Sequence, residues 1–239
     1  MILVVREGRE FLCSPGDEVH TDLGVLDVPT DASPGDVVES HLGEEFYVRA
    51  LRGPDLFNHL ERTGAPMMTK DVGLLVGHTG ASSGDSVLDA GTGTGVLAAY
   101  LGRIGADVLT FEQDPDFAET ARENMALADV ADRVTVETGD VTRHLESLGK
   151  FDLLTLDTAD APTVVGRAPE LLVSGGFLAV YSPFVEAARE SESAAREAGL
   201  SSVETLETIQ RTMDFDDRGS RPSTAGVGHT GYLTFARKL

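Results

Sequence analysis

The stretch VLDAGTGTG, residues 87–95, decides the fold of this chain. Its apolar first half is typical of a strand, and the strand ends near Asp89. Gly91, Gly93 and Gly95 then alternate before VLAAYLG, an apolar run that predicts a helix. Glycine lets the backbone approach a ligand closely, and the free N–H groups at the start of a helix can bind it. The stretch therefore predicts a strand–loop–helix unit with a ligand at the loop; a tight turn without a ligand is the alternative.

A second apolar run, DVLTFEQD at residues 107–114, ends in Glu112. In open α/β sheets, an acid at this point commonly binds the two hydroxyls of a ribose. An exposed acid without a ligand is the alternative in so acidic a protein. The loop spacing G-x-G-x-G differs from the dinucleotide pattern and resembles the first motif of S-adenosylmethionine-dependent methyltransferases. That resemblance implies S-adenosylmethionine as the cofactor. The residues assigned to it on the loop and at the next strand end are Asp89, Gly91, Thr92, Gly93, Gly95 and Glu112.

The pattern after residue 63 alternates strands and helices, which predicts an α/β fold with a doubly wound, mostly parallel Rossmann-like sheet. Residues 1–63 instead contain short β-prone runs between turns, so we expect a small β-barrel or β-sandwich domain there and a methyltransferase domain at 64–239. Three local expectations concern the second half: a short helix at 143–148, a turn at 174–176, and two final strands at 202–213 and 231–238 joined by a connecting segment.

The charge of the chain is −21, with 40 acidic and 19 basic residues. Only Lys70, Lys150 and Lys238 are lysines. Acids spread along the whole chain repel one another, and salt screens that repulsion, so the composition predicts a halophilic protein. An acidic protein that avoids nucleic acid is the alternative. No apolar run is long enough for a membrane span, and the single cysteine, Cys13, offers neither a disulfide nor a metal site. We expect a cytoplasmic protein without a metal.

Two more acids follow predicted strands. Asp140 ends VTVETGD, where methyltransferases of this architecture bind the adenine amino group of the cofactor; a helix N-cap is the alternative. Asp157 ends the fully apolar run FDLLTLD, which predicts a central strand with the acid at its tip, beside the cofactor's methyl group. A fixed carboxylate there can stabilise positive charge that develops on a methyl acceptor. Asp160, three positions further, is a candidate cap for the next helix.

The chain resembles the tRNA (adenine-N1)-methyltransferases over nearly its whole length. The motifs that carry the resemblance are TKD, LDAGTGTG, FEQDPD, TGD, LDTADAP, AVYSP and, most specifically, the ending GVGHTGYLTFARK. The resemblance implies methylation of adenine N1 in the T loop of tRNA, at position 58 and in some archaeal members also at 57. It implies Asp157 as the catalytic residue, with Tyr181 and His229, the latter beside Thr230, at the site. It further implies a homotetramer, and we expect an archaeal, halophilic member.

The sequence departs from the family in two places. Met68 and Thr69 precede Lys70 and Asp71 where the family has an aromatic residue, and the prolines and tryptophan after Asp157 are largely replaced. These changes put aromatic stacking of the target base in doubt. Tyr181 is equally a core residue, and His229 a bystander, on the sequence alone. The basic residues that we consider as a tRNA-binding face, or else as solvated partners of acids, are Arg211, Arg218, Arg221 and Arg237.

Two other readings remain open. The first is another methyltransferase of the same fold, acting on an isoaspartyl carboxyl group or on a corrinoid precursor. The second is a non-catalytic partner subunit that binds tRNA. Loss of the glycine loop or of Asp157 is expected of such a subunit, and both are present.

Overall fold

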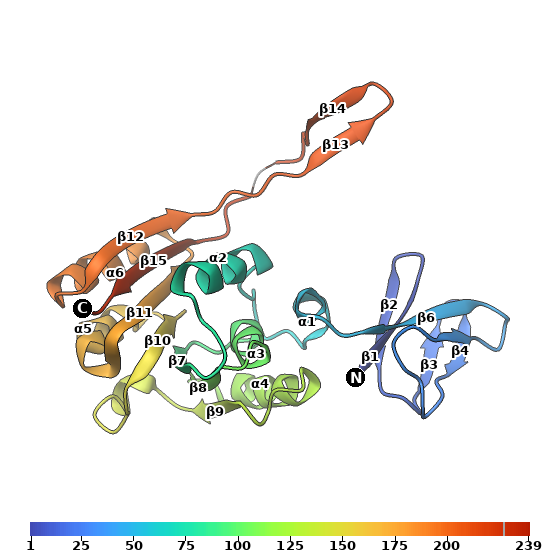
Figure 1. The fold of residues 1–239 in the computed structure, drawn as a ribbon, viewed down its shortest axis with the longest axis horizontal. Coiled ribbons are helices and arrows are strands. Elements are labelled where there is room, and N and C mark those ends of the chain that lie inside the picture. Colours follow the sequence, from blue (N-terminus) through green and yellow to red (C-terminus); the bar gives the residue numbers. More distant parts are fainter. Residues whose placement is uncertain (227) are drawn as a thin grey trace.

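The computed structural model describes residues 1–226 and 228–239, and it shows a small N-terminal unit beside a larger one (Figure 1). The larger unit is built on a seven-stranded sheet in the order β12-β15-β11-β10-β7-β8-β9. Strands β11 to β9 in this order run parallel, and β15 is antiparallel to both β11 and β12. The strands are Ser86–Ala90 (β7), Asp107–Glu112 (β8), Val134–Thr138 (β9), Phe151–Leu156 (β10), Leu172–Ser182 (β11), Ser201–Glu207 (β12) and Tyr232–Arg237 (β15). The predicted doubly wound Rossmann-like sheet is confirmed.

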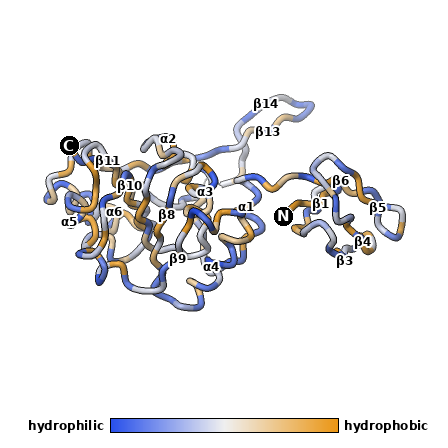
Figure 2. Tube along the Cα trace, turned by 60° about the horizontal axis from the view of Figure 1, so that its bottom comes forward, coloured by the Kyte–Doolittle hydropathy of each residue, from blue (hydrophilic) through white to orange (hydrophobic). Residues whose placement is uncertain are grey.

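Helices cover both faces of this sheet. Val87 and Leu88 of β7 enter different hydrophobic clusters because successive side chains of a strand point to opposite faces. One cluster takes residues from α1 (Gly53–His59), α2 (Thr69–Thr79), α3 (Val96–Arg103) and α4 (Pro115–Leu127). The other takes residues from α5 (Ala161–Leu171), α6 (Val185–Glu197) and the short 3₁₀ helix η1 (Val141–Arg143). Figure 2 shows hydrophobic residues along the central strands between these layers. No helix among the described residues is long and apolar enough to cross a membrane.

Local signals explain where the helices begin and end. Asp114 caps α4, because its side chain accepts hydrogen bonds from the main-chain N–H groups of Asp116 and Phe117. Pro115 stands at the first helical position, where its missing N–H costs nothing. Gly80, with φ of 73°, ends α2 in the left-handed conformation that glycine favours.

The N-terminal unit is antiparallel. Its main sheet has the order β2-β1-β6-β5, and β3 pairs with β4 separately. These strands are Ile2–Arg6 (β1), Arg9–Cys13 (β2), Glu18–Thr21 (β3), Gly24–Asp27 (β4), Val37–Glu39 (β5) and Glu45–Ala50 (β6). The unit has its own core around Val4, Leu26 and Phe46. Leu51 and Leu56, which follow the last strand, pack instead into the core of the larger unit. The domain limit at residue 63 stays a prediction.

Three local expectations are wrong. Residues 174–176 lie inside β11 and form no turn between elements, because β11 continues through them with a shift of register against β10. The expected helix at 143–148 is reduced to η1, which ends at Arg143. The long strand expected at 202–213 ends at Glu207, and a separate hairpin follows it. The hairpin pairs Met213–Asp216 (β13) with Gly219–Pro222 (β14) and extends away from the sheet (Figure 1).

Candidate active site

The carboxyl ends of β7, β8 and β10 meet at one edge of the sheet, because these strands are parallel. A cavity of about 350 Å³ opens at this edge. Its walls include Gly91, Gly93, Glu112, Gly139 and Asp157. Ligands of doubly wound sheets bind at such an edge. The structure thus brings together the glycine loop and the two acids that sequence analysis assigned to the second and the central strand.

The glycines of the loop have different roles. A Cβ atom on Gly91 would lie 2.0 Å from the carbonyl oxygen of Asp157, so only glycine fits there. A Cβ on Gly95 would lie 2.5 Å from the Cε of Met125. At Gly93 the nearest atom, the Oγ1 of Thr63, is 3.9 Å away, and Gly93 lines cavities on both sides of the loop. Packing against the protein therefore explains Gly91, whereas Gly93 borders space that a ligand can fill.

Buried hydrogen bonds of Asp89 and Thr92 hold the start of the loop in place. Asp89 is only 4% exposed, and it accepts hydrogen bonds from the hydroxyl groups of Thr110, at 2.6 Å, and Thr155. The hydroxyl of Thr92 bonds to that of Thr110. Burial raises the pKa of Asp89, and the two hydroxyl donors counteract this rise. Thr110 thus connects β8 to Asp89 and, through Thr92, to the loop, and Thr155 connects β10 to Asp89. Sequence analysis missed both threonines. The available signal was a threonine inside each of two apolar strands.

Glu112 bonds directly to the loop. Its Oε2 accepts the main-chain N–H of Gly93 at 2.8 Å, and its Oε1 accepts that of Asp114 at 3.1 Å. The carboxylate therefore stands at the wall of the cavity in a fixed orientation. A carboxylate has further lone pairs, so it can still accept ribose hydroxyl groups.

Asp140 is engaged with its own helix. It caps η1 by accepting hydrogen bonds from the main-chain N–H of Thr142 at 2.9 Å and its hydroxyl at 2.6 Å. The hydroxyl of Thr142 is the main reason why the pKa of Asp140 lies below its usual range. Its neighbours Gly139 and Val141 line the cavity. The N-cap role is thus present, and contact with a cofactor adenine stays a prediction.

Asp157 lies between the two cavities that flank the loop. Its main-chain N–H donates to the carbonyl of Ala90 at 2.8 Å, which fixes it to β7. Asp157 is an exposed residue that faces the cavity it lines. Desolvation, followed by the charges of Asp89 and Glu112, raises the pKa of Asp157 to about 7. Three acids around one small space favour a positively charged ligand there. Asp160 occupies the N-cap position of α5, but its side chain makes no capping hydrogen bond and instead accepts one from Gln113 at 3.0 Å.

Tyr181 is the second-last residue of β11 and is bonded to a buried polar network. Its hydroxyl donates to the carbonyl of Thr230 at 2.7 Å. The Nζ of Lys70 bonds to Asp71 at 2.7 Å and to the Thr230 hydroxyl at 2.8 Å, and the Lys70 and Asp71 side chains are only 9% and 2% exposed. Burial is the main cause of the raised pKa of Tyr181, and the charges of Asp71 and Asp157 add to it. Sequence analysis quoted Lys70, Asp71 and Thr230 but did not bring them together.

His229 holds the loop before β15. Its Nδ1 lies 2.8 Å from a carboxylate oxygen of Glu207, and its Nε2 lies 2.8 Å from the carbonyl of Pro183. Both ring nitrogens thus face acceptors, which favours the doubly protonated imidazolium. The Pro183 carbonyl first and Glu207 second raise the pKa of His229. The exposed ring joins three segments, β12, the end of β11 and the loop, and this arrangement supports a role in holding the loop.

Three of the four arginines considered as an RNA face, Arg211, Arg218 and Arg221, lie on or next to the β13–β14 hairpin, whereas Arg237 lies on β15. Arg218 and Arg221 lie on the hairpin, where Arg218 pairs with Asp216. Arg237 of β15 pairs with Phe177 of β11. The Cζ of its guanidinium lies 4.7 Å from the centre of the Phe177 ring. Arg237 therefore lies towards the amino ends of the parallel strands, whereas Asp157 follows the carboxyl end of β10.

These residues fit S-adenosylmethionine. The open space at Gly93, the oriented carboxylate of Glu112 and the acids beside Asp157 provide room, hydroxyl acceptors and negative charge for a cationic sulfur. Comparison with known proteins agrees with this fit. The family model of the tRNA methyltransferase complex GCD14 subunit matches residues 52–219.

Relatives match over nearly the entire length. The tRNA (adenine(57)-N(1)/adenine(58)-N(1))-methyltransferase of Methanocaldococcus jannaschii is 30% identical over 99% of this chain and 94% of its own. The tRNA (adenine(58)-N(1))-methyltransferase of Thermus thermophilus is 27% identical over 100% and 96%. A solved structure, an S-adenosylmethionine-dependent O-methyltransferase of Thermotoga maritima, has a TM-score of 0.84 at 26% identity and covers 100% of this chain and 92% of its own. The chain belongs to the GCD14 family of tRNA methyltransferases and has the S-adenosylmethionine-dependent methyltransferase fold.

Proposed function

We propose that this chain transfers a methyl group from S-adenosylmethionine to N1 of adenine in the T loop of tRNA. The target is position 58, and position 57 is the second target, as in the name of the Methanocaldococcus relative. The observation that carries the proposal is Asp157, a carboxylate at the end of the central strand that lines the cavity directly beside the glycine loop.

The chemistry of adenine suits this carboxylate. N1 is an unprotonated acceptor on the Watson–Crick edge, and the N6 amino group beside it is a donor. Asp157 accepts the N6–H, which orients the base and increases the electron density at N1. It then stabilises the positive charge that the product carries. No proton leaves N1, so a general base is not required for the attack.

The other predicted residues have supporting roles in this proposal. The cofactor supplies a methyl group bound to a positively charged sulfur. Gly93 leaves room for it, and Glu112 accepts its ribose hydroxyls; Asp140 is the proposed partner of its adenine. Tyr181 forms a wall for the target base, and its bond to Thr230 fixes the ring. His229 contributes by holding the loop that carries Thr230.

The proposal also covers the localisation, salt adaptation, oligomeric state and domain division of the enzyme. We propose a cytoplasmic, archaeal protein adapted to concentrated salt, which the charge of −21 with only three lysines supports. We also propose a homotetramer, on the family resemblance alone. A methyltransferase domain at 64–239 and an N-terminal domain at 1–63 remain our proposed division.

The test is methyl transfer from labelled S-adenosylmethionine to an unmodified tRNA transcript in molar potassium chloride, followed by nucleoside analysis. We expect 1-methyladenosine from the wild-type transcript and none when both A57 and A58 are replaced by guanosine. Transcripts with single replacements assign the position. An isoaspartyl peptide is the parallel substrate, because a protein-L-isoaspartate O-methyltransferase of Methanoculleus marisnigri matches 45% of this chain. Methyl ester formation on that peptide, without any labelled nucleoside, would overturn the proposal.

A further inference from the structure

Residues 61–67, here called the strap, connect α1 to α2 and have neither helical nor strand structure. Three of them, Ala65, Pro66 and Met67, line a narrow cavity of about 50 Å³ at the glycine loop. Asp157 lines this cavity as well as the wider one of about 350 Å³. The strap is therefore a wall of the space beside the loop.

The narrow cavity suits the amino-acid half of S-adenosylmethionine. Glu112, the proposed acceptor of the ribose hydroxyls, lines only the wider cavity, so the adenosine half belongs there. The sulfur then lies beside Asp157, and the amino-acid half reaches the narrow cavity, where Val96 and Leu97 at the start of α3 form part of the wall. The first N–H groups of a helix have no partner within it and can bind a carboxylate. The strap therefore faces the amino-acid half of the cofactor.

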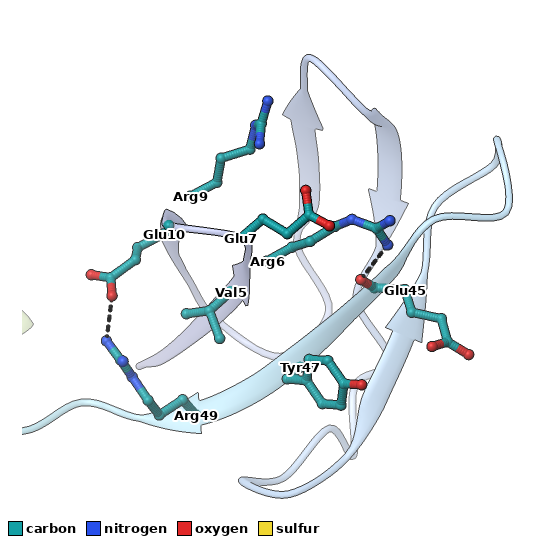
Figure 3. A pocket seen from close by; sticks show the side chains of 9 residues that line it. Val5, Arg6, Glu7, Arg9, Glu10, Glu45, Tyr47 and Arg49 are labelled. Atoms are coloured by element: carbon teal, nitrogen blue, oxygen red, sulfur yellow. Dashed lines mark hydrogen bonds and ion pairs between the residues drawn. The ribbon is translucent and has the colours of Figure 1, made fainter. Parts of the chain in front are cut away.

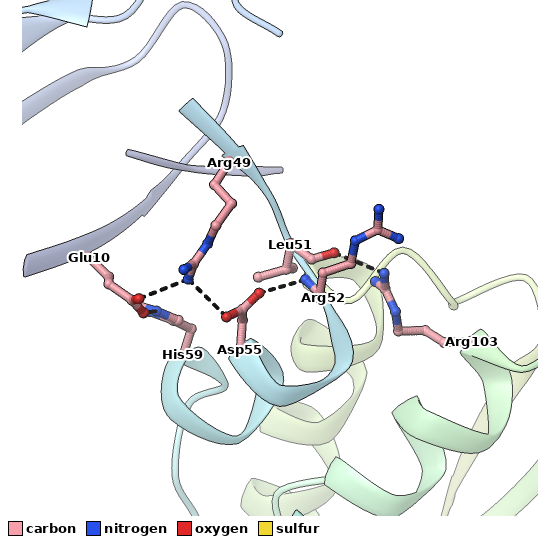
Figure 4. Close-up of polar contacts among 7 residues, drawn as sticks. All are labelled: Glu10, Arg49, Leu51, Arg52, Asp55, His59 and Arg103. Atoms are coloured by element: carbon pink, nitrogen blue, oxygen red, sulfur yellow. Dashed lines mark hydrogen bonds and ion pairs between the residues drawn. The ribbon is translucent and has the colours of Figure 1, made fainter. Parts of the chain in front are cut away.

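Both ends of the strap are fixed. Before it, α1 is bonded to the N-terminal unit through Arg49, which bonds to Glu10 at 2.8 Å and to Asp55 of α1 at 3.0 Å (Figure 4). Arg49 and Glu10 also line a separate cavity on the N-terminal sheet (Figure 3). Leu60, just before the strap, and Met67, at its end, are 3% and 7% exposed and pack into the same core.

Between these ends, a side chain of α4 holds the strap. Among the described residues, 61–67 make no main-chain to main-chain hydrogen bond. The Oδ1 of Asn124 accepts the main-chain N–H of Glu61, and its Nδ2 donates to the carbonyl of Glu61, both at 2.9 Å. The Nδ2 also donates to the carbonyl of Thr94 in the glycine loop at 2.9 Å. One side chain thus joins the strap to the loop.

The surroundings of Asn124 make these bonds matter. Asn124 is 1% exposed, and its helix neighbours Ala121 and Met125 belong to the hydrophobic core. A buried amide costs free energy unless its donors and its acceptor are bonded. Both N–H donors and the oxygen of Asn124 are bonded here, and all three bonds go to the strap or the loop. The N–H of Thr63 adds a longer contact, at 3.3 Å, to the Oγ1 of Thr94.

We propose that Asn124 is a positioning residue for the cofactor: by bonding the strap to the glycine loop, it holds the wall that faces the amino-acid half of S-adenosylmethionine. Asn124 lines neither cavity, so it acts through the strap and the loop. The inference rests on the proposed function for the place of the cofactor, and it is independent of the RNA substrate.

The central variant is Asn124→Leu, which keeps the size of the side chain and removes all three bonds. It is compared with wild type in calorimetry on two ligands, S-adenosylmethionine and 5′-methylthioadenosine. The second ligand keeps the adenosine half and a methyl-bearing sulfur but has no amino-acid half. We expect the affinity for S-adenosylmethionine to fall at least about fivefold and that for 5′-methylthioadenosine to change less than about twofold. A general loss of structure weakens both ligands alike.

Val134→Ala is the matched control. Val134 belongs to the same hydrophobic core as Leu60 and Met67 but lines neither cavity. Both Val134→Ala and Asn124→Leu should lower the Tm, because both disturb buried contacts. Only Asn124→Leu should lose affinity for S-adenosylmethionine.

Arg62 gives a readout that needs no activity, because it places a trypsin site on the exposed part of the strap. We expect native Asn124→Leu to be cut after Arg62 at least about fivefold faster than wild type, as local opening of the strap becomes more frequent. Val134→Ala should be cut there at the wild-type rate. Saturating S-adenosylmethionine should slow the cut in wild type.

The outcomes separate this inference from the proposed function. If wild type binds S-adenosylmethionine but Asn124→Leu binds it equally well and is cut at the same rate, only the positioning role is refuted. Equal weakening of the two ligands in Asn124→Leu refutes it as well. If wild type binds the cofactor but methylates no tRNA, the proposed function falls, and the ligand and trypsin comparisons still decide the role of Asn124. If wild type does not bind the cofactor, both fall together.

Discussion

The main-chain N–H of Gly93 donates a hydrogen bond of 2.8 Å to the carboxylate of Glu112, so the glycine loop and the end of the second strand form one surface. A side chain at position 93 would project from that surface into open space, where only the Oγ1 of Thr63 lies within 4 Å. This relationship makes position 93 the most direct probe of cofactor binding.

Gly93→Val should therefore abolish binding of S-adenosylmethionine in calorimetry. The matched control is Gly35→Val, at another glycine with positive φ and open surroundings in the N-terminal unit. Both variants suffer backbone strain, but only the first blocks the cavity. Unchanged affinity in Gly93→Val would contradict the cofactor site.

Replacement of Asp157 separates catalysis from binding. Asp157→Asn keeps the shape but loses the charge, so single-turnover methyl transfer should fall by roughly two to three orders of magnitude. Affinity for tRNA should change little, because phosphate contacts supply most of it. A rate within a few-fold of wild type would show that the catalytic group lies elsewhere.

The pH dependence follows from the pKa of Asp157, which is raised to about 7. The ionised form accepts the N6–H, so kcat/KM of the wild type should rise with pH through about 7. In Asp157→Asn this step should be missing from the residual activity. A pH profile that falls through the same region would contradict the assigned protonation state.

The same pKa predicts a stability effect with a definite sign. The pKa is higher in the folded than in the unfolded chain, so the native state binds more protons and loses stability as pH rises from about 4 to about 7. Asp157→Asn avoids this loss. Its Tm should exceed that of wild type most clearly at about pH 8, and the difference should shrink towards about pH 4. A difference independent of pH would mean that the carboxyl has no raised pKa.

The buried pair of Lys70 and Asp71 should be essential for the fold. Asp71→Ala leaves Lys70 buried without its charged partner and should cost about 3–5 kcal/mol in the free energy of unfolding. The control is Asp216→Ala, which breaks an exposed pair on the hairpin and should leave the unfolding midpoint unchanged. Equal effects of the two variants in denaturant unfolding would contradict the burial of the Lys70 network.

The sequence predicted that the glycine loop, Glu112 and Asp157 come together, and they line one cavity, because these signals are local. The glycine loop, Glu112 and Asp157 each follow an apolar strand directly, and parallel strands bring their carboxyl ends together. The bond between Lys70 and Thr230 spans 160 positions, and nothing local announces it. The β13–β14 hairpin was missed because residues 202–213 have the composition of one continuous strand, although the segment turns away from the sheet after Glu207. Asp140 shows a further limit, since the same residue type serves as helix cap and as ligand acceptor.

Gly91 and Gly93 differ in their freedom to mutate. Any side chain at 91 would collide with the main chain of Asp157, so a substitution there displaces the residue that we propose as catalytic. A side chain at position 93 meets no such collision, so apart from the strain of its positive φ, a change there alters the room beside the carboxylate. Selection for a bulkier sulfonium donor can therefore act through the surroundings of position 93, while position 91 is closed to it. Two glycines that look equivalent in the motif thus mark an adaptable site and a fixed one.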